Sequence, residues 1–261
     1  MLDNRPVGRS MLNKVPEVTL VFWLIKIMST TVGETGADYL AVHVGLGTSV
    51  TGLLMITLLA AVLAIQLRMD RYVPWVYWLT VVLVSIVGTQ ITDALTDKLE
   101  ISLYLSTAAF AIALAATFAI WFSVERTLSI HSIVTQRREL FYWAAILFTF
   151  ALGTAAGDLA TEALGLGFNA GVVAFAALIA AIAAAYALGA NAVVTFWLAY
   201  ILTRPLGASF GDLLSQAREY GGLGFGTIYT SLAFLTVIVA LVAWLSFEGD
   251  AGGKPEASPG A

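Results

Sequence analysis

One spacing recurs four times in this chain: a Trp, a Gly ten residues later, and an Asp five residues after the Gly. The four sets are Trp23/Gly33/Asp38, Trp78/Gly88/Asp93, Trp143/Gly153/Asp158 and Trp197/Gly207/Asp212. Each set lies in a segment otherwise apolar enough to cross a bilayer, where a carboxylate is costly and usually functional. The pattern therefore predicts a membrane protein made of four copies of one unit, each with an intramembrane acid.

The composition supports a membrane location. The chain is 59% hydrophobic and 11% charged, whereas soluble domains are roughly 45–50% apolar and about 25% charged. Apolar stretches of about 20 residues are candidate spans. The candidates are 17–40, 49–67, 74–95, 103–124, 140–161, 169–189, 192–214 and 226–247. Because strand-like alternation is weak, we expect an all-α integral membrane fold with eight transmembrane helices rather than a β-barrel.

The spans divide into four tandem two-helix repeats, with a polar segment at each end. The expected parts are a cytoplasmic N-terminal segment 1–15, a membrane domain 16–247 with repeats 15–72, 73–130, 137–189 and 191–247, and a disordered tail 248–261. An even number of spans per copy gives every copy the same orientation. The copies are then related by axes along the membrane normal. This predicts a pseudo-symmetric bundle.

Basic residues favour one side of the predicted membrane. Nine of the thirteen Lys and Arg lie in segments on the side of the N-terminus, and only Lys98 and Arg218 lie in loops on the other side. The positive-inside rule then places both termini in the cytoplasm. All seven Trp fall on the inner side and are interpreted as an interfacial belt.

The acids are the main candidates for chemistry. Fifteen residues of helix span about 22 Å, which puts the repeated Asp in the outer third of a core ~30 Å thick. Further acids accompany them: Asp97 and Glu162 four residues after an Asp, and Glu34 in the first repeat. Oxygen ligands favour hard cations. The functional interpretation is a cation site or proton relay, and the alternative is that each Asp caps a helix end.

Two cations and the repeated glycines complete the candidate site. Lys26 either snorkels toward the inner interface or acts in an ion pair or gate. Arg204 lies near the membrane midplane before Pro205, which is expected to kink the helix, and it is interpreted as an interior counter-ion or gate. The glycines are interpreted as helix-packing positions, with local unwinding around a bound ion as the alternative. They are Gly33, Gly88, Gly153 and Gly207.

Short segments in each copy carry a family resemblance. They are TVGETGAD at 31–38, GTQITD at 88–93, GTAAGD at 153–158 and RPLGASFGD at 204–212, together with ERTLSIH at 125–131 and LTRP at 202–205. Over residues 11–247 the chain resembles a family of bacterial membrane proteins built from four copies of a short repeat of unknown function. The resemblance implies a polytopic inner-membrane protein and supplies no activity.

The function expected from the residues is a transporter or channel for a small hard cation, such as H⁺, Na⁺, Mg²⁺ or Mn²⁺. The alternatives are a structural or accessory membrane protein and, with less support, an intramembrane enzyme. The chain has no Cys and no catalytic triad, zinc-protease or phosphate-loop motif, so we expect neither an enzyme nor a cofactor. The expected partners are the lipid bilayer and the cation, with no nucleic acid; homo-oligomerisation stays open.

Overall fold

The computed structural model describes residues 13–38 and 47–252, and over these ranges the chain forms eight α-helices and no strands. The helices are α1 (Leu20–Asp38), α2 (Gly47–Arg68), α3 (Pro74–Asp93), α4 (Leu103–Glu125), α5 (Gln136–Asp158), α6 (Gly167–Ala187), α7 (Ala192–Ser215) and α8 (Thr227–Gly252). Two π-helical segments, η2 (Ala94–Lys98) and η4 (Leu159–Ala163), continue α3 and α5. Two short 3₁₀ helices, η3 (Ile130–Ser132) and η5 (Arg218–Tyr220), lie in connections.

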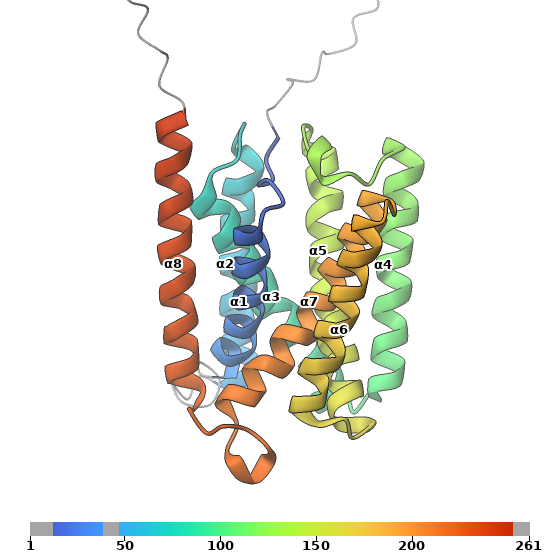
Figure 1. The fold of residues 1–261 in the computed structure, drawn as a ribbon, viewed down its shortest axis with the longest axis vertical. Helices are drawn as coiled ribbons and strands as arrows, with labels where there is room; N and C mark the ends of the chain where they lie inside the picture. The colour runs from blue at the N-terminus through green and yellow to red at the C-terminus, as the bar shows by residue number, and fades with distance from the viewer. Residues whose placement is uncertain (1–12, 39–46, 253–261) are drawn as a thin grey trace, which may run out of the picture.

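The odd-numbered helices form the interior of the bundle. They contact one another in the ring order α1, α3, α5, α7 and back to α1. The even-numbered helices lie outside this ring: α2 packs on α3, α4 on α5, α6 on α7 and α8 on α1 (Figure 1). Burial agrees with this arrangement, because 61% of the apolar window of α5 is buried but only 6% of that of α6.

Seven of the helices in the described ranges are long and apolar enough to cross a membrane. The apolar part of the remaining helix, α1, is shorter and covers Leu20–Gly33. α1 can carry fewer apolar residues because α3, α7 and α8 all pack against it. The outer helices expose large apolar side chains such as Leu53 and Ile112, as expected for contact with lipid. The fold is therefore that of a multi-pass membrane protein.

The ends of the helices follow local sequence signals. Asn191 Oδ1 accepts hydrogen bonds from the backbone N–H groups of Val193 and Val194, at 3.0 and 3.2 Å, and so caps α7. Pro74 begins α3, where its missing N–H costs nothing. α8 continues to Gly252, four residues beyond the start of the expected tail at 248, and residues 253–261 lie outside the described ranges.

The interpretation of the tryptophans as an interfacial belt is largely wrong. Four of the seven are buried in the protein: Trp78, Trp121, Trp143 and Trp197. The rings of Trp121 and Trp197 meet edge to face with their centroids 5.9 Å apart. The outer helices enclose α3, α5 and α7, so the tryptophans of these inner helices pack against protein instead of lipid headgroups. Trp75 and Trp244 are the exposed ones.

Candidate functional site

The inner helices present their side chains to the interior in successive layers. Residues four apart lie on one helix face. The interior face of each inner helix therefore carries the positions Trp−1, Trp+3, Trp+7, Trp+11 and Trp+15, counted from the Trp of its repeat. The inner layer, at Trp+3, contains Lys26, Val81, Ile146 and Tyr200, and the middle layer, at Trp+7, contains Thr30, Ser85, Phe150 and Arg204. All eight side chains are 0% exposed. These two layers form the most deeply buried part of the bundle.

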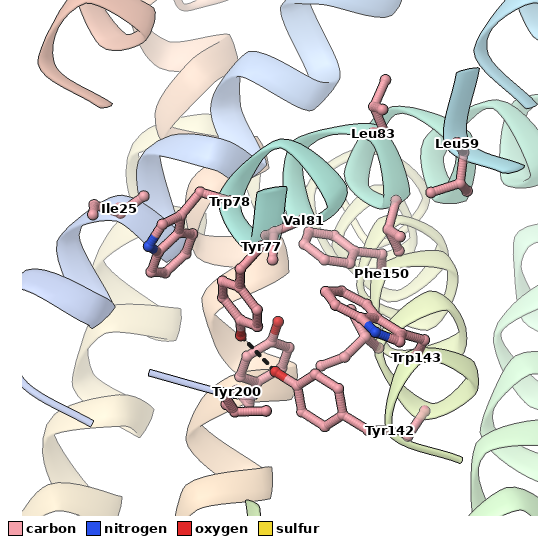
Figure 2. Packing of buried hydrophobic residues seen from close by; sticks show 14 of the residues in the cluster. Ile25, Leu59, Tyr77, Trp78, Val81, Leu83, Tyr142, Trp143, Phe150 and Tyr200 are labelled. Atoms are coloured by element: carbon pink, nitrogen blue, oxygen red, sulfur yellow. Dashed lines mark hydrogen bonds between the residues drawn. The ribbon is translucent and has the colours of Figure 1, made fainter. Parts of the chain in front are cut away.

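Aromatic side chains close the interior at the N-terminal ends of the inner helices. This aromatic layer, at Trp−1, contains Phe22, Tyr77, Tyr142 and Phe196, of which the first three are buried. The hydroxyl oxygens of Tyr77 and Tyr142 are 2.6 Å apart and share a hydrogen bond, with the Tyr200 ring beside them (Figure 2). Aromatic side chains and one pair of hydroxyl groups therefore fill this end of the four-helix ring.

Lys26 and Arg204 each reach across the ring. The Lys26 Nζ lies 3.9 Å from the centre of the Phe150 ring and 4.4 Å from that of Tyr200. Arg204 donates a hydrogen bond from Nη2 to the Thr89 hydroxyl. α1 and α5 are opposite members of the ring, as are α7 and α3. The snorkelling alternative for Lys26 is therefore wrong, because its side chain extends into the protein interior.

Hydroxyl groups and then acids follow beyond the middle layer. The hydroxyl layer, at Trp+11, contains the buried side chains of Thr89 and Thr154, and Ala208 takes this position in α7. Glu34 occupies the same position in α1, but its side chain lies outside the described part. The acid layer, at Trp+15, contains the half-buried side chains of Asp93, Asp158 and Asp212 together with Asp38, whose side chain is also outside the described part. Polar character thus increases toward this end of the ring.

Two of the acids stand where the helix changes type. Asp93 and Asp158 are the last α-helical residues before η2 and η4. Neither side chain caps the π-helical segment that follows it, so the structure does not show capping of these segments. Glu162 lies within η4, and Asp97 lies within η2 with its side chain outside the described part. Such π-helical turns are rare and often occur at functional sites, and no sequence pattern predicted them.

The described acids do not converge on one point. Among the residues with described side chains, no three His, Asp or Glu come close enough together to hold a metal ion. Individual carboxylates of the acid layer can still bind a proton or a hydrated cation. The side chains that could enlarge the group, those of Glu34, Asp38 and Asp97, are outside this description.

The repeat glycines permit close packing around the ring. A Cβ atom built on each would lie well inside normal contact distance of a middle-layer residue on the next inner helix. The distances are 2.0 Å from Gly33 to Ser85 Oγ, 2.8 Å from Gly88 to Phe150 Cβ, 2.4 Å from Gly153 to Arg204 Cβ, and 2.7 Å from Gly207 to Thr30 Cβ. The α-helices run unbroken through all four positions, without the local unwinding of the alternative interpretation.

A buried ion pair at the same end as the aromatic layer was missed by sequence reasoning. Lys14 pairs with Glu139, both 1% exposed, and also donates a hydrogen bond to the carbonyl of Leu67 at 3.2 Å. Gln66 Nε2 donates to Glu139 Oε1 at 3.0 Å. These contacts hold the segment before α1 against the end of α2 and the start of α5. Gln66, a glutamine inside the apolar helix α2, was the feature of the sequence that could have indicated these buried contacts.

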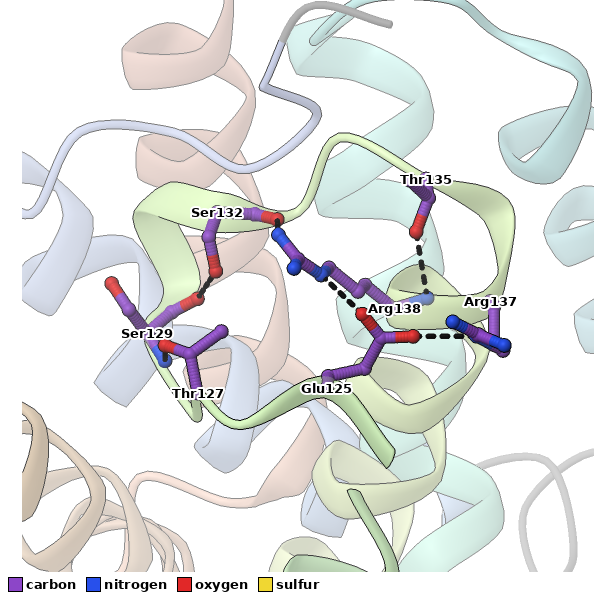
Figure 3. A network of polar contacts seen from close by, with 7 residues as sticks. All are labelled: Glu125, Thr127, Ser129, Ser132, Thr135, Arg137 and Arg138. Atoms are coloured by element: carbon purple, nitrogen blue, oxygen red, sulfur yellow. Dashed lines mark hydrogen bonds and ion pairs between the residues drawn. The ribbon is translucent and has the colours of Figure 1, made fainter. Parts of the chain in front are cut away.

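A second polar group nearby joins α4 to α5. Glu125 accepts hydrogen bonds from Arg137 Nε at 2.5 Å and from Arg138 Nε at 2.7 Å (Figure 3). Arg138 Nη1 also donates to the carbonyl of Ser132 at 3.0 Å, which holds η3 against the helix end. A groove of about 500 Å³, lined by α1, α6, α7 and η3, lies close to these contacts and includes Glu17 and His131.

A comparison with known families identifies the repeat. A family model matches residues 21–72, 76–127, 141–189 and 195–250. Each matched segment contains one inner helix and the outer helix that follows it in the chain. No curated protein and no solved structure gives a match. The chain therefore belongs to the family described as Repeat of Unknown Function (DUF347), and it contains four tandem copies of that repeat.

Proposed function

We propose that this protein is a secondary transporter for a small hard cation in the bacterial inner membrane. The observation that carries the proposal is the order of layers in the interior. Half-buried carboxylates lie at one end, hydroxyl groups come next, and Lys26 and Arg204 cross the ring below them. The same order suggests a pseudo-four-fold bundle in which each repeat contributes one residue to each layer.

The acid and hydroxyl layers supply the ligands. Asp93, Asp158 and Asp212 are accessible enough to meet a cation from one side of the membrane, and Thr89 and Thr154 offer further oxygen atoms. Oxygen-only ligands suit H⁺, Na⁺, Mg²⁺ and Mn²⁺. The distribution of Lys and Arg in the loops supports an orientation with the acid layer on the outer side and both chain termini in the cytoplasm.

The inner and middle layers favour a transporter over an open channel. While Lys26 is protonated, a cation passing ~6 Å from it would be opposed by about 3 kcal/mol at an effective dielectric constant near 20. The buried aromatic layer and the Lys14–Glu139 pair close the path beyond it. Passage would therefore require these layers to rearrange, and alternating access provides that rearrangement.

The test is cation flux into proteoliposomes carrying Asp93→Asn or Asp158→Asn. Asn keeps the size of the side chain and removes its charge. Because a hydrogen bond to a charged group contributes about 1.5–3 kcal/mol, flux at low cation concentration should fall at least roughly tenfold in each variant. The matched control is Asp70→Asn, since Asp70 is an exposed loop acid outside the layers.

The outcomes separate the alternatives. Wild-type flux in both variants would remove these acids from the mechanism. Absence of flux from the wild-type protein for every hard cation, combined with loss of stability in both variants, would favour the structural or accessory role.

A further inference from the structure

The interior contains a group that can change its charge. We infer that Lys26 is the site where this protein takes up and releases a proton in exchange for the transported cation. The coupling to a cation rests on the proposed function, but the release and uptake of a proton by Lys26 can be tested without transport.

The surroundings of Lys26 offset a positive charge only weakly, because the aromatic faces attract an ammonium but carry no negative charge. Its side chain is 0% exposed, and its Nζ contacts the Thr30 hydroxyl at 3.4 Å and the faces of Phe150 and Tyr200. Within the described part of the chain, no carboxylate lies within ion-pair distance of it. Glu34 stands eight residues further along α1, which is about 12 Å of helix. An uncompensated ammonium in such a place is costly.

A second cation makes the balance less favourable. Arg204 lies one helical turn after Tyr200 on the same face of α7, and the Lys26 Nζ contacts the Tyr200 ring, so the two cations are neighbours in the interior. A guanidinium group does not lose its proton in proteins, whereas a lysine amine does so when its surroundings disfavour charge. Of the two, only Lys26 can therefore relieve the repulsion. It does so by giving one proton to water, which leaves a neutral amine that still contacts Thr30.

Among the side chains that the structure describes, the other helices packed around Lys26 bring no acid within ion-pair distance of it. α7 contributes Arg204 and Tyr200, and the nearest titratable groups of α3 and α5 in the layers are Tyr77 and Tyr142. α8 has no charged residue between Thr227 and Phe247. The charge state of Lys26 therefore depends on Arg204 and on any cation that enters from the acid layer.

This dependence couples the proton on Lys26 to the presence of the cation. The hydroxyl layer is eight residues, or about 12 Å, from the inner layer. A cation there would shift the proton occupancy of Lys26 about tenfold at an effective dielectric constant near 20. One positive charge enters as one proton leaves, and the proton returns from water when the cation departs.

The first experiment measures unfolding midpoints of purified protein between pH 6 and 9 for the wild type, Lys26→Met and Lys26→Arg. If the folded protein releases the Lys26 proton within this pH range, the unfolded chain binds more protons than the folded one, so wild-type stability should rise with pH relative to Lys26→Met. Lys26→Arg should be the least stable, because its charge is permanent. Lys98→Met, at an exposed position, should follow the wild-type profile.

Two results would overturn the inference. One is a pair of parallel pH profiles for the wild type and Lys26→Met. The other is a stabilisation of the wild type by chloride over gluconate that Lys26→Met lacks, since a bound anion would then balance a charged lysine.

The second experiment follows proton counterflow during cation flux in proteoliposomes. Lys26→Met should lower the ratio of protons to cations moved relative to the wild type, and an unchanged ratio would exclude Lys26 as the exchanging group. If no cation moves in the wild type, the proposed function fails, while the stability profiles still decide whether Lys26 exchanges a proton.

Discussion

Gly207→Ala tests the packing of the inner ring. The added methyl carbon would lie 2.7 Å from Thr30 Cβ and 2.9 Å from the backbone oxygen of Ile27, where ordinary contact begins near 3.4 Å. Neither neighbour can yield easily, because Thr is β-branched and stiff at χ1 and the Ile27 oxygen belongs to the backbone of α1. α1 and α7 must therefore move apart where they cross.

The net effect combines three contributions. Overpacking of this kind costs about 1–3 kcal/mol. Separation of the helices also weakens the 2.8 Å hydrogen bond from Thr31 Oγ1 to the Gly207 carbonyl, worth about 0.5–1.5 kcal/mol. Because Ala forms helices better than Gly, the substitution also adds about 0.5–1 kcal/mol to the free energy of unfolding. We expect the free energy of unfolding to fall by about 2 kcal/mol.

Gly52→Ala is the matched control. A Cβ at Gly52, in α2, would meet nothing closer than the side-chain oxygen of Gln90 at 4.0 Å. This variant should be more stable than the wild type by about 0.5–1 kcal/mol. Reversible unfolding in mixed micelles measures both values. Equal gains in stability for the two variants would refute the close contact between α1 and α7.

Two further predictions concern the polar contacts near the aromatic layer. Glu139→Gln leaves the buried Lys14 without its carboxylate, so the unfolding midpoint should drop by an amount equivalent to about 3 kcal/mol; the exposed Glu219→Gln is the control, and matching midpoints would contradict the buried pair. Arg138→Gln should destabilise by about 1 kcal/mol and more than Arg137→Gln, because Arg138 is less exposed and also binds the Ser132 carbonyl. The reverse order in chemical denaturation would count against this network.

The helical repeats were accessible from the sequence because hydrophobic length alone predicts spans. The family model confirms the four tandem copies. The interior position of Arg204 also followed from its depth in an apolar segment. The sequence could not reveal which helices enclose which, and the errors follow from that. Lys26 is near enough to the predicted interface to snorkel, but α8 and α3 cover its helix. Trp143 reads as an interfacial anchor, but it lies inside the ring.

Contacts between distant segments were equally inaccessible. Lys14 and Glu139 are 125 residues apart and form a pair only after the ring closes. Lys14 alone looks like an ordinary inner-loop charge. The π-helical turns after Asp93 and Asp158 arise without any Gly or Pro at those positions.

The packing of each outer helix on the inner helix of the next repeat has a consequence for biosynthesis. α1 leaves the ribosome first, but its cover, α8, is made last. Until α8 is made, the flank of α1 that α8 covers has no permanent neighbour, so termination before Thr227 would leave that flank of α1 uncovered. Because α1 begins and α8 ends at the same end of the bundle (Figure 1), the two ends could be joined and the chain reopened in another connection. In such a circular permutant a different inner helix would be synthesised long before the outer helix that packs on it, while the closed ring would stay the same.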